Sequence, residues 1–314
     1  MTICAEEQQQ ASQVLATVRD CLRWGESALR RGEVFLGHGT DDYGDEVLGL
    51  LLHVLALPWD SDPRLLDARL LPAEIERFVG LMVQRVNERR PAAYLTGRAW
   101  FCGLEFKVDE RVLVPRSPLA ELIEQCFEPW LVPEQVSRVL DLCTGSGCIA
   151  IATAFALPQA EIDATDICEE ALAVCRDNIE RHGVEQQVRA RQGDGLAAAE
   201  GQYDLIISNP PYVDAADMTS LPDEYRHEPV LALASGADGL DFTRRLLRDA
   251  PDHLSEQGIL IVEVGNSWET MLNIWPEVPF FWFEFERGGH GVFMLTREQL
   301  LAHRHSFSAQ TPVQ

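Results

Sequence analysis

Apolar and polar positions recur with helical spacing through the first 90 residues. Within three segments, apolar side chains return every three or four positions, which predicts helices over residues 12–30, 44–57 and 72–90. Pro91 ends the third helix, because proline cannot continue a helical hydrogen-bond ladder. We therefore expect a small helical domain over residues 1–91.

The pattern changes after residue 91. Two short runs, residues 95–101 and 104–108, flank the turn residues Cys102-Gly103, and this arrangement predicts a β-hairpin. We expect the hairpin to form a linker over residues 92–114, followed by a second domain over residues 115–314.

Short apolar runs then alternate with helical segments as far as residue 264. We predict strands over residues 138–142, 161–165, 188–192, 203–208 and 258–264, and helices over residues 119–127, 148–156, 169–182 and 242–250. Such alternation predicts a doubly wound, mainly parallel sheet. Two last runs, 280–285 and 292–296, are joined by a short glycine-rich turn and must be antiparallel, which gives seven strands. Residues 306–314 are expected to fray.

The charge balance narrows the class of partner. Fifty acidic and 26 basic residues give a formal net charge of -24. Because phosphate contacts supply most of the affinity for nucleic acid, this balance argues against stable nucleic-acid binding. It suits a basic protein partner, although solubility alone also explains an acidic surface.

Other features of the composition indicate a cytoplasmic protein. No stretch approaches the roughly 20 consecutive apolar residues of a membrane helix, and the polar first 13 residues are unlike a secretory signal. The eight cysteines show no Cys-x-x-Cys pair and no zinc spacing with histidine, so we expect reduced thiols and no metal site. His303-x-His305 is expected to be solvated.

The segment over residues 139–150 is predicted to be a strand, a tight glycine turn and a helix. Glycine allows a sharp bend and a close approach by a ligand, and the amide groups of the helix start suit an anionic group. Such turns are also often purely structural. The candidate cofactor-binding residues here are Asp141, Cys143, Thr144, Gly145 and Gly147.

Two further acidic residues lie at the ends of the next strands. Asp166 follows Asp141 by 25 residues, where a carboxylate can accept hydrogen bonds from ribose hydroxyls, although it could instead cap the following helix. Asp194, followed by Gly195, is placed to face an adenine amino group. The set predicts a nucleotide-type cofactor. A carboxylate at Asp141 favours the cationic methionine end of S-adenosylmethionine over the pyrophosphate of NAD.

Asn209-Pro210-Pro211-Tyr212 ends the fourth strand of the motif. Oxygens of Asn209 and Pro210 can accept both hydrogens of a planar amino group, and the prolines hold the backbone in place. Tyr212 can pack on the flat group. The sequence here resembles amino-methyltransferases that carry Asn-Pro-Pro-Tyr, which methylate adenine, cytosine or glutamine. The resemblance implies that these four residues are catalytic, with Asn209 also beside the cofactor, in a Rossmann-like class I fold that uses S-adenosylmethionine.

The resemblance extends over most of the chain to the glutamine methyltransferases related to the release-factor enzyme. The segments that carry it are Glu228-Pro229, Ala232-Leu233 and Gly236-Ala237-Asp238-Gly239-Leu240. Release-factor enzymes usually have Pro-Arg-Pro-Glu-Thr-Glu where this chain has Pro115-Arg116-Ser117-Pro118-Leu119-Ala120. The Pro-Arg-Ser-Pro form of this segment is similar to that of the branch that modifies large-subunit ribosomal protein L-three. The later segment Gly289-His290-Gly291-Val292-Phe293 is also similar to that branch. We expect the helical domain to recognise the substrate.

Three other readings remain open on the sequence. The same reaction could act on peptide chain release factors. An adenine methyltransferase of nucleic acids would need a basic groove and would flip out its target base. A factor that binds S-adenosylmethionine without catalysis, and assists ribosome assembly, would not need the Asn209–Tyr212 motif.

Overall fold

The computed structural model describes residues 2–308 and divides into two compact units, which are described separately. The helical unit runs to Arg98 and also includes Pro222–His227. The sheet unit comprises Ala99–Leu221 and the chain from Glu228 onward. The chain therefore leaves the sheet unit once, contributes six residues to the helical unit, and returns.

The helical unit packs its helices around one apolar core. Its helices are α1 (Ala5–Val14), α2 (Val18–Arg31), α3 (Tyr43–Leu55), α4 (Pro72–Asn87) and α5 (Ala92–Thr96). The prediction of one helix over residues 12–30 is wrong at its start, because the chain breaks between α1 and α2. Thr17 causes this break: its side chain accepts a hydrogen bond from the Asp20 backbone, and the Asp20 carboxylate accepts one from the Thr17 backbone.

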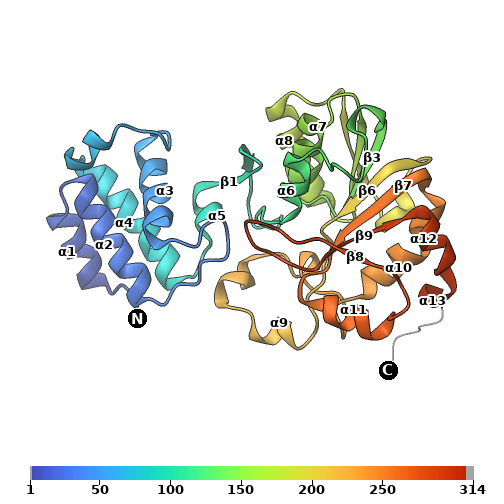
Figure 1. Cartoon of the computed structure of the whole chain (residues 1–314). Helices are drawn as coiled ribbons and strands as arrows, with labels where there is room; N and C mark the ends of the chain where they lie inside the picture. The colour runs from blue at the N-terminus through green and yellow to red at the C-terminus, as the bar shows by residue number, and fades with distance from the viewer. Residues whose placement is uncertain (1, 309–314) are drawn as a thin grey trace. The chain divides into compact units, whose positions relative to one another are not determined.

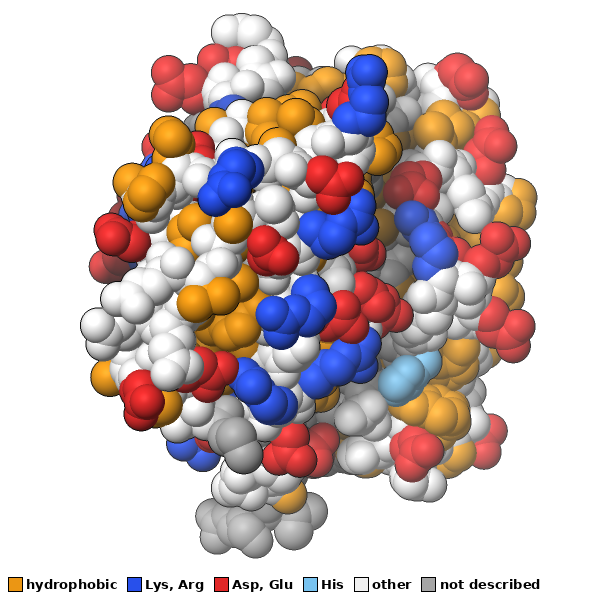
Figure 2. Space-filling view, turned by 90° about the vertical axis from the view of Figure 1, so that its left-hand side faces the viewer, with side chains coloured by type: hydrophobic (Ala, Val, Ile, Leu, Met, Phe, Trp, Pro, Cys, Tyr) orange, Lys and Arg blue, Asp and Glu red, His pale blue; other side chains and the backbone are white. Residues whose placement is uncertain are grey.

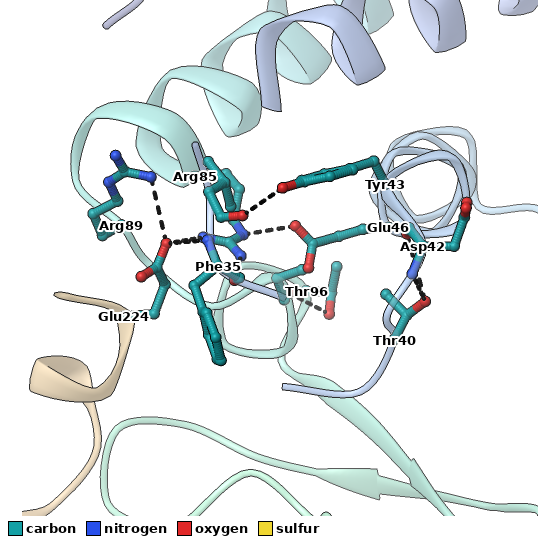
Figure 3. Close-up of polar contacts among 11 residues, drawn as sticks. Phe35, Thr40, Asp42, Tyr43, Glu46, Arg85, Arg89, Thr96 and Glu224 are labelled. Carbon is teal, nitrogen blue, oxygen red and sulfur yellow. Dashed lines mark hydrogen bonds and ion pairs between the residues drawn. The ribbon is translucent and has the colours of Figure 1, made fainter. Parts of the chain in front are cut away.

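A buried arginine connects the helices of this unit to the segment from the second half of the chain (Figure 3). Arg85 on α4 is fully buried, and its Nε donates to Glu46 Oε1 at 2.8 Å while its Nη2 donates to the Phe35 carbonyl at 2.8 Å. Glu224 Oε1 accepts from the Phe35 backbone at 3.0 Å and lies 3.4 Å from Arg85 Nη1. Glu224 thus supplies one of the two carboxylates that balance this buried charge.

The first 98 residues carry a nearly even mixture of charges. They contain 15 acidic and 11 basic residues, a net of -4 from a chain total of -24. Figure 2 shows Lys and Arg side chains in the middle of one face, with acidic side chains among and around them. Most of the negative charge therefore lies beyond residue 98.

The sheet unit begins with the predicted hairpin. β1 (Arg98–Phe101) and β2 (Leu104–Lys107) pair through a turn in which Cys102 and Gly103 both have positive φ, +48° and +74°. The hairpin starts later than residue 95, because the preceding residues close α5.

The main sheet has the predicted seven strands and is mainly parallel (Figure 1). Its strands, in spatial order, are β5 (Val188–Gln192), β4 (Glu161–Asp166), β3 (Arg138–Leu142), β6 (Tyr203–Ser208), β7 (Leu254–Glu263), β9 (Val292–Thr296) and β8 (Phe281–Trp282). β9 runs antiparallel to both β7 and β8, which confirms the predicted antiparallel pair. β8 is shorter than residues 280–285, and β7 starts four residues before 258 because Leu254 already pairs with Tyr203.

Helices cover both faces of the sheet. α6, α7 and α8 lie on one side, and α10, α12 and α13 lie on the other (Figure 1). The helices of this unit are α6 (Leu119–Glu124), α7 (Cys148–Ala156), α8 (Glu169–His182), α9 (Asp217–Ser220), α10 (Asp241–Asp249), α11 (Trp268–Ile274), α12 (Arg297–Ala302) and α13 (Arg304–Ser308). The expected fraying from residue 306 is wrong for the residues within α13; residues 309–314 lie outside the described chain.

The strand order reverses at β3, which locates the site. β3 lies between β4 and β6. After β3 the chain forms β4 and β5 on one side of β3, and it then returns to form β6 on the other side. In open α/β sheets a crevice forms at such a reversal, beyond the carboxyl ends of the strands.

Candidate active site

A cavity of about 800 Å³ lies at this end of the sheet. Its volume lies within the range typical of small-molecule sites. The residues predicted from the sequence that line it are Cys143, Gly145, Asp166, Asp194, Gly195, Asn209 and Pro211. Four strand ends therefore contribute to one cavity. The other predicted residues, Asp141, Thr144, Gly147, Pro210 and Tyr212, are not among those lining it in the described chain.

The turn after β3 is held in a conformation that few residues adopt. Gly147 has φ +81°, and a Cβ there would lie 2.7 Å from Cys175 Sγ, so glycine is required for both reasons. Cys143, which lines the cavity, also has positive φ at +60°. Strained backbone of this kind is typical of functional sites.

Asp141 lies beneath the turn. The side chain is fully buried, and its Oδ2 accepts hydrogen bonds from Thr144 Oγ1 at 2.5 Å and from the Ala150 backbone at 3.1 Å. Burial raises the pKa of Asp141 to about 7. Asp141 therefore supports the turn with one oxygen, and its predicted contact with a cofactor stays a prediction. Its Oδ1 is buried without a hydrogen-bond partner in the described chain.

Asp166 is fixed at the cavity wall by backbone groups. Its Oδ2 accepts from the Gly145 amide at 3.0 Å, and its Oδ1 accepts from the Cys168 amide at 2.9 Å. Burial raises its pKa, while these hydrogen bonds oppose the change. Each carboxylate oxygen keeps a second lone pair for a ligand hydroxyl, because an ionised carboxylate can accept about four hydrogen bonds.

Asp194 has an ion-pair partner that the sequence reasoning missed. Both of its oxygens bond to the Arg245 guanidinium, at 2.8 and 2.9 Å, and this bond holds the pKa of Asp194 below its ordinary value. The neighbouring Gly195 has φ +57° and lines the same wall. Arg245 comes from α10 and fixes the orientation of Asp194.

Asn209 lines the cavity and carries an unsatisfied acceptor. Its Oδ1 is buried and has no hydrogen-bond partner within residues 2–308. The preceding residue is fixed, because Ser208 Oγ donates to the Leu142 carbonyl at 2.8 Å across the β3–β6 pair. A buried polar atom without a partner costs free energy, which is typical of an atom that meets a ligand.

Tyr212 is held at both its hydroxyl and its carbonyl. Its hydroxyl donates to Glu263 Oε1 at 2.9 Å, and its carbonyl accepts from Ser267 Oγ at 3.0 Å. Stacking of this ring on a planar substrate group stays a prediction. These contacts show that the last residue of the motif is fixed to the end of β7.

The sequence did not predict a place for Glu263 in the site or the pairing of Arg116 with Glu228. Glu263 is the last residue of β7, and Asp141 lies near the end of β3. The search for acidic residues at strand ends that pointed to Asp141 could therefore also have pointed to Glu263. Arg116 forms a bidentate pair with Glu228 at 2.6 Å for each bond, a partner 112 residues away that local patterns cannot predict. The cavity wall also includes side chains from later segments: Leu231, Asp241, Arg244 and Arg248.

Within residues 2–308 no group of three or more His, Cys, Asp or Glu side chains could hold a metal ion. Over the same residues, no helix is both long and apolar enough to cross a membrane. All eight cysteines are free thiols.

Comparison with known proteins gives close relatives along nearly the whole chain. Residues 124–224 match the family model "Methyltransferase small domain". The chain is 49% identical over 293 residues to a ribosomal protein uL3 glutamine methyltransferase of Neisseria gonorrhoeae, covering 93% of this chain and 98% of that protein. It is 48% identical over 292 residues to the protein of the same name from Bordetella pertussis, covering 92% and 97%. A crystal structure of a methyltransferase from Pyrococcus furiosus is similar over 62% of this chain and 89% of that one, with 22% identity and a TM-score of 0.45.

Proposed function

We propose that this chain, which belongs to the family of ribosomal protein uL3 glutamine methyltransferases, methylates the side-chain amide nitrogen of a glutamine in uL3. As a member of this family, the chain is an S-adenosylmethionine-dependent methyltransferase. The single observation that carries the choice of an amide as the reacting group is the unsatisfied Oδ1 of Asn209 at the cavity wall.

Asn209 has the chemistry that an amide substrate needs. The lone pair of an amide nitrogen is delocalised, so the nitrogen is a poor nucleophile while its group stays planar. Asn209 Oδ1 accepts one N–H hydrogen and the Pro210 carbonyl accepts the other, which lets the nitrogen pyramidalise. Pro210 and Pro211 keep these acceptors preorganised. The gain comes from alignment of the reacting atoms.

The cavity also fits the cofactor. When bound, S-adenosylmethionine supplies a methyl group activated by the positive charge on its sulfur. Asp166 offers lone pairs to ribose hydroxyls, and Asp194 is the acceptor for an adenine amino group. We assign Asp141 Oδ1, buried and without a partner in the described chain, as the acceptor for the cationic ammonium group. Cys143, Thr144, Gly145, Gly147 and Gly195 shape the backbone around these acceptors.

The charge distribution supports a basic ribosomal protein as partner. Residues 99–314 contain 35 acidic and 15 basic residues, a net of -20, against -4 for the first 98 residues. A basic substrate is attracted to such a surface, and nucleic acid is repelled. We place this reaction in the cytoplasm, where ribosomal proteins are made.

We assign recognition of uL3 to the helical unit. The support is topological: Pro222–His227, which follow the Asn209–Tyr212 motif by ten residues, belong to that unit. The unit that contacts the partner is then linked directly to the loop beside the reacting group.

The test is methyl transfer to three candidate substrates. The enzyme and S-adenosylmethionine are incubated separately with unmethylated uL3, a release factor and DNA, and the added methyl is located by mass spectrometry. We expect methyl on one uL3 glutamine, lost in Asn209→Ala and retained in Asn273→Ala, a matched change at an exposed asparagine of α11. Methyl on the release factor alone, or on DNA alone, would overturn the assignment.

A further inference from the structure

Glu263 joins three segments of the sheet unit. It is the last residue of β7 and is buried, with 4% of its surface exposed. Its Oε1 accepts a hydrogen bond from the Tyr212 hydroxyl at 2.9 Å, and its Oε2 accepts one from Ser117 Oγ at 2.6 Å. One carboxylate therefore connects the last residue of the Asn209–Tyr212 motif with the turn at residues 115–118.

Two further contacts hold the main chain and one ring edge of Tyr212. Ser267 Oγ fixes its carbonyl, and its ring lies against Gly265, where a Cβ would come within 2.5 Å of the ring. Gly265 has φ +45°, so both its conformation and its neighbour favour glycine. With the main chain and one ring edge fixed, the bond to Glu263 sets the position of the far end of the ring.

We propose that Glu263 is a positioning residue for methyl transfer, which holds Tyr212 and through it the adjacent Asn209–Pro211 acceptors, and that Ser117 orients its carboxylate. This inference rests on the proposed function. Glu263 touches no reacting atom in it: the residue acts through the three-residue connection from Tyr212 back to Asn209. A displacement of about 1 Å at the reacting atoms can cost roughly a hundredfold in rate.

The ionisation of Glu263 gives the proposal a distinctive signature. Burial raises its pKa to about 7, while hydrogen bonds from Ser117 and Tyr212 and the charge of Arg116 oppose that rise. Arg116 is itself paired with Glu228. The ionised form accepts from both hydroxyls. A protonated form becomes a donor at one oxygen and cannot accept both bonds in the same geometry.

The first experiment compares Glu263→Gln with the wild type on uL3. We expect kcat to fall about tenfold to a hundredfold, with KM changed less than twofold. We also expect the wild-type kcat to fall below about pH 7, and this limb to be absent in Glu263→Gln. Glu256→Gln, an exposed glutamate on the same strand, is the matched control and should keep the wild-type values.

A double-mutant cycle tests whether Glu263 acts through Tyr212. In a Tyr212→Phe background the hydroxyl is gone, so Glu263→Gln should cost little more. Ser117→Ala, which keeps the buried carboxylate, should lower kcat several-fold and serves if Glu263→Gln folds poorly. Three results would overturn the proposal: unchanged kcat in both Glu263→Gln and Ser117→Ala, a rise in KM alone, or independent losses that multiply in the double variant.

A second readout needs no turnover and separates this inference from the proposed function. With ¹³Cζ-labelled tyrosine, the Tyr212 resonance should shift with pH around 7 in the wild type and not in Glu263→Gln. A wild type that fails to methylate uL3 would refute the proposed function. A Tyr212 signal with the same pH response in Glu263→Gln would refute the link between these residues.

Discussion

Replacing Asp141 by Asn should raise the free energy of unfolding at neutral pH, whereas replacing a buried charged residue usually lowers it. Asparagine has nearly the same shape and can accept from Thr144 Oγ1 and the Ala150 amide as Asp141 Oδ2 does. It cannot ionise. The folded wild type, by contrast, must ionise a fully buried carboxyl at neutral pH, because burial raises the pKa of Asp141 from 3.8 to about 7.

The sign and size of the effect follow from proton linkage. Between about pH 4 and pH 7 the folded chain keeps the Asp141 proton and the unfolded chain has lost it, so the free energy of unfolding falls as pH rises. The difference of about three pH units corresponds to about 4 kcal/mol over the whole window. Above pH 7 both states are ionised and the contribution becomes constant. Asp141→Asn should therefore match the wild type near pH 4 and exceed its stability by on the order of 4 kcal/mol at pH 8.

Urea unfolding followed by circular dichroism at several pH values between 4 and 8 measures this. The pKa of Glu263 is raised in the same direction, so Asp141→Asn should remove one part of the fall in stability with rising pH and Glu263→Gln another part. Glu256→Gln should change nothing. Calorimetry should also show weaker binding of S-adenosylmethionine by Asp141→Asn, because the partnerless Oδ1 is replaced by a donor. If Asp141→Asn kept the wild-type pH slope, the assigned ionisation would be incorrect.

Two further changes test the geometry of each unit. Glu224→Ala should lower the free energy of unfolding by about 3 kcal/mol, at the low end for a broken buried ion pair because Arg85 keeps Glu46; exposed Arg226→Ala should cost less than about 0.5 kcal/mol. Chemical denaturation distinguishes them, and equal losses would contradict the assignment. Gly147→Ala should destabilise the fold and abolish cofactor binding, because its Cβ would lie 2.7 Å from a buried thiol. Gly183→Ala, also at positive φ but with no atom near the new Cβ, should cost only about 1 kcal/mol and bind normally.

The sheet and its strand-end residues could be predicted because several local signals agree there. β3, its glycine turn and α7 have matching periodicity, turn chemistry and burial, and their bounds agree with the structure. α1 was missed because it buries little apolar surface: Ala11 is its only buried residue among those described. Packing against the neighbouring helices, and not the apolar pattern of its own sequence, stabilises α1 as a helix.

The site was predicted as a set of strand ends, but the direction of each side chain was not. Asp141 lies at the expected strand, yet the pleat turns it beneath the turn, since neighbouring strand residues face opposite sides. Glu263 also lies at a strand end, but it was overlooked because it follows an apolar run. The partners of Arg116 and Arg85 lie 112 and 139 residues away, and no local pattern encodes such distances.

The six residues that the helical unit takes from the middle of the chain bear on how the protein is synthesised. A nascent chain of 98 residues has all five helices of that unit, but its buried guanidinium still lacks Glu224. The unit reaches its final charge balance only after residue 227 has left the ribosomal tunnel, when β3 to β6 are already made and β7 to β9 are not. During synthesis, the helical unit therefore cannot be completed before the sheet unit begins to emerge. Its last six residues emerge only after more than half of the sheet unit has been made.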